Sequence, residues 1–430
     1  MQRVVVVGGG YAGCGAAIGA ALRGVKVILV ERLDVLLGVG ALGAGLNAFN
    51  ARNTIMLESM AMGGGADLFE AMESVITYRT NIPQQEHGYL YDNLKVEKAI
   101  RDVLEKAGIH VLFNSTVDRT VMRGDRLEAV RLKNGEAIEA GAFVDATGGT
   151  GPQGLCARYG NGCSMCVMRC PSYGPRISLS AKAGVKEWAT PREDGLVGAM
   201  TNSTVLVRES VAPEVLRRLE EAGGWMYLPV PKGFAPDRDH LRQIRANQFL
   251  SEKTEYEDNI VCLDVGVFKM ASYPYVNLQV LRSMPGFENA AFLDPLCGSK
   301  GNSVRFLANA PRDDRFQVLE RPNLFCAGEK SGQLIGIIDA LVTGILAGNN
   351  AARAALGEPL LEIPRTTALG EGIAWVREQI GDPQGKYKKY SFLGAGGLLD
   401  HLKDRGLYTV DRQAIRDRIG EAGLLDAYRS

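Results

Sequence analysis

The chain begins with a strand, a glycine-rich turn, a helix and a second strand. A similar strand, turn and helix follow near the C-terminal end of the sequence. Residues 4–31 read VVVVGGGYAGCGAAIGAALRGVKVILVE, in which an apolar run meets Gly8-x-Gly10-x-x-Gly13 before an Ala-rich helix. Residues 321–353 again give a short strand, a Gly turn and a small-residue helix. The first segment has the pattern of a nucleotide-binding crossover, and a long insertion separates it from the second. This arrangement predicts an α/β, Rossmann-like fold that binds FAD with two separate segments.

The three glycines of the first turn have different physical roles. Gly8 permits the tight turn off the strand, Gly10 lets the backbone approach a pyrophosphate, and Gly13 lets the helix pack closely on the sheet. The helix starts with Tyr11 and Ala12, and its free N–H groups and dipole favour an anion at this end. We therefore expect these five residues to bind the cofactor. The alternative is a Gly-rich turn without a ligand.

An acid ends the second strand of this first unit. Glu31 lies 18 residues after Gly13 and is followed by Arg32. A carboxylate at this place can accept hydrogen bonds from the adenosine ribose, and it disfavours the 2′-phosphate of NADP. The pattern is therefore compatible with FAD or NAD, with Glu31 and Arg32 as cofactor-binding residues.

A third segment favours FAD over NAD. Residues 142–149 read AFVDATGG, a short apolar strand that ends in a turn containing Thr147 and Gly148. Flavoproteins with two dinucleotide-binding segments return to the nucleotide domain through such an Ala-Thr-Gly turn, close to the FAD. An ordinary strand-ending turn is the alternative for this segment alone, but the three segments together indicate FAD.

Composition limits the class of partner. Lys plus Arg and Asp plus Glu both number 49 in 430 residues, so the chain has no overall field that would attract nucleic acid or an anionic membrane. We find neither a secretory signal nor a run of ~18 apolar residues. A cytoplasmic protein without a membrane partner is expected, and its eight cysteines are then reduced or metal-bound.

The order of the segments predicts an FAD fold with an inserted, mixed α+β substrate domain. The Gly-, Ala- and Met-rich residues 38–66 are expected to lie along the flavin. Residues 92–107 predict an amphipathic helix capped by Asp92 or Asn93 and ended by Gly108. Strands are expected at 109–113, 127–132 and 142–146, with an Asn134-Gly135 turn between the last two. The expected parts are 1–150 (first FAD part), 151–285 (substrate and cysteine-cluster domain), 286–365 (second FAD part) and 366–430 (helical tail).

Four of the cysteines lie close together in the expected inserted domain. They are Cys156, Cys163, Cys166 and Cys170, and the last three give C-x2-C-x3-C-P. This spacing matches the closing part of a bacterial ferredoxin motif, so the first interpretation is a [4Fe–4S] cluster. A four-thiolate zinc site, a redox-active Cys163/Cys166 pair and plain reduced loop cysteines are the alternatives.

The other cysteines divide into one candidate and three packing residues. Cys297 lies in DPLCGSKGNS, shortly before the second FAD segment, where a thiolate near Lys300 would be reactive. It is the candidate catalytic residue, with an unreactive loop cysteine as an equal alternative. Cys262 is expected in the core, and Cys14 and Cys326 are expected to pack beside the nucleotide-binding turns.

Residues 280–364 carry a family resemblance. The stretches VLRSMPGFENAAF, ERPNLFCAGEKSG, IDALVTGILAGNNAARAALGEP and IPRTTALG resemble the C-terminal FAD segment of the GidA/TrmFO-like flavoproteins. That family includes a tRNA uridine carboxymethylaminomethyl-modification flavoprotein and a folate-dependent tRNA uridine methyltransferase. The resemblance implies an FAD fold and a helix starting near Gly336 whose dipole faces the flavin. The residues that it implies near the flavin are Gly328, Glu329, Gly332, Ile335 and Gly336.

Three departures from this family decide the functional expectation. Glu329 replaces the Gln of the methyltransferases, residues 47–53 lack their cysteine, and the cysteine cluster belongs to neither tRNA-modifying pattern. We therefore expect an FAD-dependent oxidoreductase that passes electrons between flavin and the cysteine-ligated centre, or to a small molecule or redox protein. The alternatives are a folate- or flavin-dependent tRNA uridine-modifying enzyme with a cysteine nucleophile, and a flavoprotein subunit of a larger electron-transfer complex. tRNA is not the favoured partner, and a homodimer is compatible with the sequence.

Overall fold

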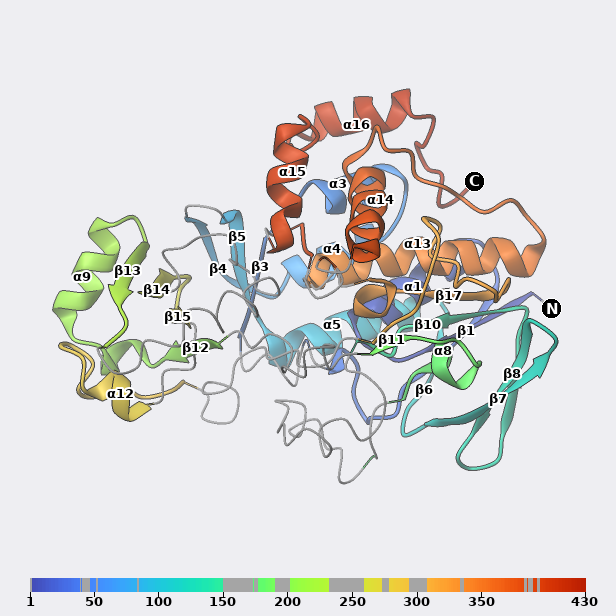
Figure 1. Ribbon diagram of the computed structural model, residues 1–430, viewed down its shortest axis with the longest axis horizontal. Coiled ribbons are helices and arrows are strands. Elements are labelled where there is room, and N and C mark those ends of the chain that lie inside the picture. Colours follow the sequence, from blue (N-terminus) through green and yellow to red (C-terminus); the bar gives the residue numbers. More distant parts are fainter. Residues whose placement is uncertain are drawn as a thin grey trace.

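A computed structural model of the chain provides the structure. It describes residues 2–38, 40, 47–51, 53–82, 85–149, 173, 177–189, 202–231, 259–272, 278–293, 308–332, 336–382, 385, 390–392 and 395–430. Figure 1 shows the parallel sheet and its covering elements at one end, a second group of strands and helices at the other, and the C-terminal helices above the centre, over helix α13.

The centre of the fold is a five-stranded sheet in which every neighbouring pair is parallel, in the order β17-β10-β1-β2-β6. Its strands are short runs rich in Val, Leu and Phe. Apart from the edge strand β6, they are mostly buried on both faces, as expected for a parallel sheet covered on two sides. The strands are β1 (Arg3–Val7), β2 (Lys26–Val30), β6 (His110–Leu112), β10 (Ala142–Asp145) and β17 (Leu324–Cys326).

Helices cover one face of this sheet. Val4 and Val6 of β1 belong to the same core cluster as side chains from α1 (Tyr11–Ala21), α5 (Asn93–Lys106) and α13 (Ile337–Leu356). Helices α1 and α13 approach each other through small residues. A Cβ added at Gly15 would lie 2.3 Å from the Leu341 carbonyl oxygen, and one at Gly344 would lie 2.2 Å from that of Ala12. Only glycine permits this backbone-to-backbone contact.

A three-stranded antiparallel sheet covers the opposite face. It consists of β7 (Val117–Arg123), β8 (Arg126–Leu132) and β9 (Ala137–Glu139), in that order. Val5 and Val7 of β1 pack with Val130 and Ile138 of this sheet, because alternate residues of a strand point to opposite faces. Helix α8 (Leu179–Lys182) joins the same cluster through Leu179.

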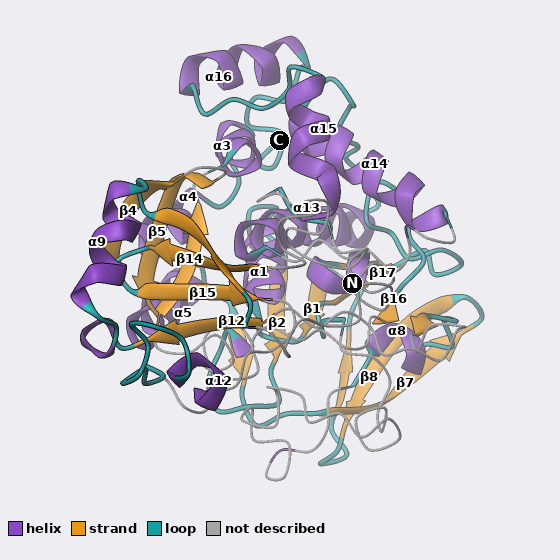
Figure 2. Ribbon diagram, turned by 60° about the vertical axis from the view of Figure 1, so that its left-hand side comes forward, coloured by secondary structure: helices purple, strands orange, loops and turns teal. Residues whose placement is uncertain are grey.

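Two further sheets pack against each other at the far end of the molecule (Figure 2). The first has the order β3-β5-β4, and the second, antiparallel, has the order β12-β15-β14-β13. Leu90 of the first sheet shares a core cluster with Trp225, Val261 and Leu263 of the second. The strands are β3 (Asn47–Ala51), β4 (Ile76–Ile82), β5 (Gln85–Asp92), β12 (Asn202–Leu206), β13 (Trp225–Pro229), β14 (Asn259–Asp264) and β15 (Phe268–Ser272).

The other face of the four-stranded sheet packs on helices α9 (Pro213–Glu221) and α12 (Leu278–Arg282), with the 3-10 turn η2 (Arg208–Ser210) preceding α9. Two short strands, β11 (Trp188–Ala189) and β16 (Ala308–Asn309), pair antiparallel. They lie in the two stretches of chain that join the four-stranded sheet to the parallel sheet.

A buried acid links the C-terminal helices to the N-terminal part of the chain. Glu58 of α3 (Thr54–Ala61) is fully buried, and its carboxylate accepts hydrogen bonds from the N–H groups of Ala368 and Leu369 at 2.9 and 2.8 Å. Arg418 donates to it at 2.9 Å. Burial raises the pKa of Glu58, although these donors oppose the rise. The remaining elements are α4 (Ala66–Glu73), η3 (Gly328–Ser331), α14 (Ala368–Gly381), η5 (Ala395–Gly397), α15 (Leu398–Asp404) and α16 (Arg412–Glu421).

The structure confirms the amphipathic helix and refines the strands expected beside it. Asp92 caps α5 by accepting from the Leu94 N–H at 2.8 Å, while the Leu94 side chain is 75% exposed. The Asn134-Gly135 turn closes the hairpin of β8 and β9, so the prediction that β10 follows this turn directly was wrong. Strand β7, which precedes β8, was also missed. In the described part of the chain, no helix is long and apolar enough to span a bilayer.

Candidate functional site

Three turns converge at the carboxyl edge of the parallel sheet. They follow β1, β10 and β17, and β1 has β2 on one side and β10 on the other. Ligands of open α/β sheets bind where the strand order reverses in this way. The turns contact one another directly: the Ala327 N–H donates to the Asp145 carbonyl oxygen at 3.1 Å, and the Gly149 N–H donates to Glu329 Oε2 at 3.3 Å.

The glycines of the first turn lie as a pyrophosphate site requires. Gly8 has a φ of +102°, and a Cβ there would lie 2.5 Å from the Ala146 carbonyl oxygen. A Cβ at Gly13 would lie 1.8 Å from the Gly8 carbonyl oxygen, whereas one at Gly10 would meet no atom within 4 Å. Gly10 therefore faces open space at the N-terminus of α1, where backbone N–H groups can receive an anion.

The acid that follows β2 accepts a hydrogen bond from the backbone of this turn. Glu31 Oε2 accepts from the Gly9 N–H at 2.6 Å, and its Oε1 accepts from the Leu33 N–H at 2.8 Å. Each carboxylate oxygen has a further lone pair that a ribose hydroxyl could use. Arg32 follows and is half-buried.

Tyr11 and Ala12 are buried at the start of α1. The Tyr11 hydroxyl lies 3.0 Å from that of Tyr91 in β5, and burial raises the pKa of both phenols. The tyrosine pair therefore fixes the start of α1 to the three-stranded sheet beside it.

The second and third turns carry the other expected cofactor residues. Thr147 donates through N–H and Oγ1 to Asp145 Oδ1 at 3.1 and 2.6 Å, and Gly148 has a φ of +79°. Gly328 has a φ of +62°, and a Cβ there would lie 2.7 Å from that of Ala12. The site thus unites residues from both ends of the chain.

Helix α13 begins where the sequence predicts, with Gly336 as its N-cap. Asp339, in its first turn, is fully buried and accepts from the Phe392 N–H at 2.8 Å and from Ser391 Oγ at 3.2 Å. Burial raises the pKa of Asp339 to about 6, which these hydrogen bonds only partly oppose. Gly332 lies before this helix, and a Cβ there would lie 2.6 Å from Ile380 Cδ1.

A buried polar network lies next to these turns and was not anticipated from the sequence. Lys330 of η3 donates to Glu187 Oε1 at 2.8 Å and to Ser178 Oγ at 3.2 Å, and its side chain is 1% exposed. Asp145 accepts from the N–H and the hydroxyl of Ser180, both at 2.7 Å. The available signal was Lys330 itself, a charge four residues after the end of β17 in the AGEKSG stretch.

This network has unused hydrogen-bonding capacity. Glu187 Oε2 and both amide atoms of Asn309 are buried and have no partner. Asn309 pairs across the β11–β16 ladder with Trp188, the residue after Glu187. Buried polar groups are rarely left unpaired, so a water molecule or a polar group of a ligand is expected among them.

The described cysteines have no sign of reactivity. Cys14, Cys262 and Cys326 are free and buried, and burial raises the pKa of each thiol. This confirms the expectation that they are packing residues. In the described part of the chain, no group of three or more His, Cys, Asp or Glu side chains could hold a metal ion. Several predicted site residues lie outside the described residues: Cys156, Cys163, Cys166, Cys170, Cys297 and Ile335.

Comparison with known proteins agrees with this geometry. Residues 3–151 match the family model described as FAD dependent oxidoreductase, and residues 248–359 match that of glucose inhibited division protein A. The fold resembles a solved structure of Aquifex aeolicus GidA with a TM-score of 0.59 at 16% identity, covering 97% of this chain and 76% of that one.

Two curated relatives show how far the sequence similarity extends. The tRNA uridine 5-carboxymethylaminomethyl modification enzyme MnmG of Thermus thermophilus is 25% identical, over 84% of this chain and 66% of that protein. The methylenetetrahydrofolate–tRNA-(uracil-5-)-methyltransferase TrmFO of Desulfotalea psychrophila is 38% identical, over 25% of this chain and 23% of that protein. The matches thus span about two thirds of the MnmG relative and about a quarter of the TrmFO relative.

The parallel sheet, its three converging turns and the first family match define an FAD-dependent oxidoreductase. Within that class, the chain is GidA/TrmFO-like: part of it matches the GidA family model, and it is similar to an MnmG in sequence and to GidA in fold. The family resemblance inferred from residues 280–364 is therefore confirmed.

Proposed function

We propose that this protein is an FAD-dependent enzyme that modifies a uridine base of tRNA. The observation that carries the proposal is the similarity to an MnmG over 84% of the chain, together with three turns arranged for a dinucleotide. This was the alternative at the level of sequence. It replaces electron transfer to an iron–sulfur centre as the favoured function, because both curated relatives described above are named as tRNA-modifying enzymes.

The residues present fit FAD. Gly10 leaves open space at the N-terminus of α1, and Gly8 and Gly13 permit the close contacts around it. In this proposal Gly8, Gly10 and Gly13 hold the pyrophosphate with the backbone of Tyr11 and Ala12. Glu31 holds the ribose, with Arg32 beside it. The residues proposed to lie along the flavin are Thr147, Gly148, Gly328, Glu329, Gly332, Ile335 and Gly336.

When bound, FAD would supply the exchange of reducing equivalents. The protein would contribute position and electrostatics. The first turn of α13 would present its N–H groups to the ring end of the cofactor, where they would favour negative charge. Glu329, held by the Gly149 N–H, would be a half-buried carboxylate beside the ring. Cys297, or a cysteine of the cluster, is the proposed nucleophile toward the uridine ring.

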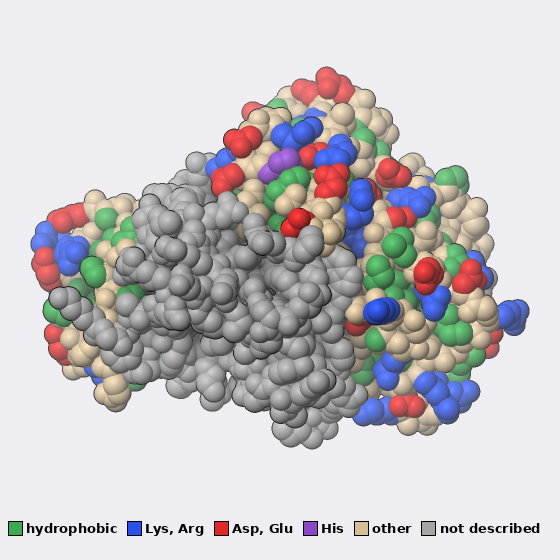
Figure 3. All heavy atoms as spheres, viewed as in Figure 1, with side chains coloured by type: hydrophobic (Ala, Val, Ile, Leu, Met, Phe, Trp, Pro, Cys, Tyr) green, Lys and Arg blue, Asp and Glu red, His purple; other side chains and the backbone are tan. Residues whose placement is uncertain are grey.

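The inserted part of the chain is proposed to bind the substrate. We assign substrate binding to residues 151–285, which contain the four-stranded sheet. That sheet packs on strands β3 to β5 of the first part, so a substrate held there would lie beside the FAD-binding part. Acidic and basic side chains are mixed over the described part of the surface in Figure 3. On this face, a tRNA would meet local groups of Lys and Arg mixed with acidic side chains.

The test is comparison of tRNA nucleosides by mass spectrometry between cells with and without the gene. We expect one modified uridine to disappear with the gene and to return with the wild-type chain, but not with Gly13→Val or Cys297→Ser. An unchanged uridine profile would reject the function. The purified protein should also contain FAD and bind tRNA less tightly as salt rises.

A second candidate rests on one specific observation, the C-x2-C-x3-C-P spacing at 163–171. It is the exchange of electrons between FAD and a [4Fe–4S] cluster held by Cys156, Cys163, Cys166 and Cys170, with zinc as the alternative metal. Iron and acid-labile sulfide at about four each per anaerobically purified chain would support it, and their absence together with bound FAD would leave the tRNA function alone.

A further inference from the structure

Three helices of the core begin at the same edge of the parallel sheet. A Cβ at Gly15 would lie 2.3 Å from the Leu341 carbonyl oxygen, and one at Gly19 would lie 2.1 Å from that of Ile345. Each helix advances by four residues between these two contacts, so α1 and α13 run parallel. Because α1 follows β1 directly, both N-termini open at the carboxyl edge of the sheet, where the three turns converge.

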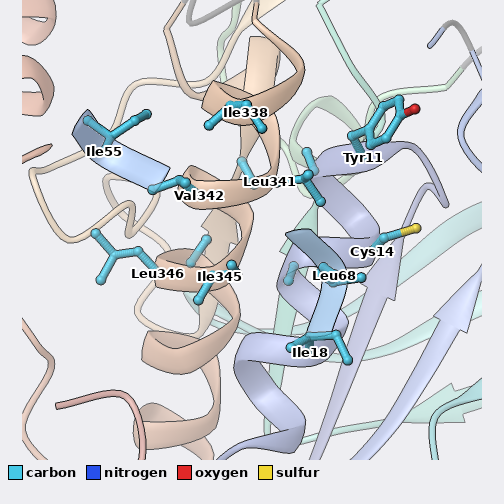
Figure 4. Close-up of a cluster of buried hydrophobic side chains, with 14 of the residues drawn as sticks. Tyr11, Cys14, Ile18, Ile55, Leu68, Ile338, Leu341, Val342, Ile345 and Leu346 are labelled. Carbon is cyan, nitrogen blue, oxygen red and sulfur yellow. The ribbon is translucent and has the colours of Figure 1, made fainter. Parts of the chain in front are cut away.

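Helix α3 runs in the same direction on the other side of α13. Figure 4 shows Ile55, in its first turn, beside Ile338 and Val342 of α13, with Tyr11 of α1 on the opposite side. Gly64 follows the end of α3, and a Cβ there would lie 2.9 Å from Ile345 Cγ2. The start of α3 therefore lies near the start of α13, and the helix N-termini follow the order α1, α13, α3.

The N-terminus of α3 carries two buried polar atoms without a partner. Asn53 caps the helix by accepting from the Met56 N–H at 3.1 Å, but its Nδ2 is unpartnered. Thr54 Oγ1 is unpartnered as well. The two residues are 1% and 0% exposed, so water at the surface does not satisfy them. Buried hydrogen-bonding groups are almost always paired in a working protein, which points to a ligand that these two donors bind.

We propose that Asn53 and Thr54 bind the carbonyl-bearing pyrimidine edge of the flavin, and that the N-terminus of α3 acts together with that of α13 on this ring. The inference rests on the proposed binding of FAD. A cofactor whose pyrophosphate lies at α1 reaches α13 and then α3 with its ring end. An amide N–H and a hydroxyl suit carbonyl acceptors, and two helix N-termini stabilise negative charge on the reduced ring.

The decisive variants remove one donor each and keep the local structure. Thr54→Val preserves the shape of the side chain without the hydroxyl, and Thr54→Ser restores the hydroxyl. Asn53→Asp keeps the capping oxygen and removes the Nδ2 donor. FAD affinity is measured by quenching of flavin fluorescence on binding to apoprotein, and the midpoint potential by equilibration with redox dyes. Neither measurement needs the substrate or turnover.

We expect Thr54→Val and Asn53→Asp each to weaken FAD binding about 3- to 10-fold, the equivalent of one hydrogen bond. Both should also lower the midpoint potential, while Thr54→Ser stays close to wild type in affinity and potential. Unchanged affinity and potential in Thr54→Val would overturn the inference, even if its thermal stability changed. If Asn53→Asp does not fold, the comparison of the two Thr54 variants decides alone.

The same titration separates this inference from the function on which it rests. A wild-type chain that binds no FAD would reject both. A wild-type chain that binds FAD but leaves every tRNA uridine unmodified would reject the tRNA function only, and the Thr54 comparison would still decide the role of α3.

Discussion

The buried ion pair of Lys330 and Glu187 permits a sharp energetic prediction. The two side chains are 1% and 4% exposed, with Nζ and Oε1 2.8 Å apart. Glu187 Oε1 also accepts from Ser178, and Glu187 Oε2 has no partner. Removing one member of such a pair leaves an uncompensated buried charge, which typically costs about 3–5 kcal/mol. We therefore expect Lys330→Met and Glu187→Gln each to lower the free energy of unfolding by about that amount.

The double variant is the critical case. Replacing a buried ion pair by neutral groups of similar volume is often close to neutral, because both desolvation costs disappear with the attraction. Lys330→Met combined with Glu187→Gln should therefore be more stable than either single variant. The assay is urea unfolding followed by tryptophan fluorescence, with Trp188 next to Glu187. Single effects that add in the double variant, or that each stay below about 1 kcal/mol, would refute the reasoning. Lys330→Arg, which keeps the charge, is the control.

Three further predictions concern packing, pH and the C-terminal helices. Gly344→Ala should destabilise by about 1–3 kcal/mol in thermal unfolding, because its Cβ would lie 2.2 Å from a carbonyl oxygen of α1. Gly381→Ala, which has open space, should not destabilise. Because the pKa of Asp339 rises from 3.8 to about 6, the folded protein binds this proton more tightly than the unfolded chain. Stability should therefore fall as pH rises from about 4 to about 6, by at most about 3 kcal/mol, and Asp339→Asn should lose this pH dependence in urea titrations. Arg418→Met should leave the Glu58 carboxylate without its cation and speed hydrogen exchange in residues 398–430, with the parallel sheet unchanged; equal exchange in both regions would contradict this.

The geometry of the turn after β1 was the part of the candidate site that the sequence predicted best. The tight turn at Gly8 and the close helix contact at Gly13 follow from spacing alone, because a strand, a tight turn and a helix leave few conformations for the chain. The start of α13 at Gly336 was expected from the family resemblance of residues 280–364, and the structure has Gly336 as the N-cap. In these segments the physical constraint lies within a few neighbouring residues.

The buried polar groups could not be predicted, because their partners come from distant parts of the sequence. Lys330 and Glu187 are 143 residues apart, and Glu58 and Leu369 are 311 residues apart. The hydrophobic periodicity of a sequence predicts local helices and strands, and it does not indicate which distant residues will pair. Leu94 shows a further limit of sequence patterns, since its side chain is apolar but lies in solvent in the first turn of the amphipathic helix α5. Short strands such as β9, with three residues, also have too little alternation to be recognised.

The glycine-lined contact of α1 and α13 has a mechanical consequence for the whole chain. Where two backbones touch, no side chain can change rotamer to alter their spacing, so the distance between the two helix starts is set by van der Waals contact between backbone atoms. The two helix N-termini that would bind the ends of a dinucleotide thus keep the same distance when residues are inserted elsewhere in the chain. A family built on such a frame can exchange the long segment between its halves, and with it the choice of substrate, while the cofactor keeps its place.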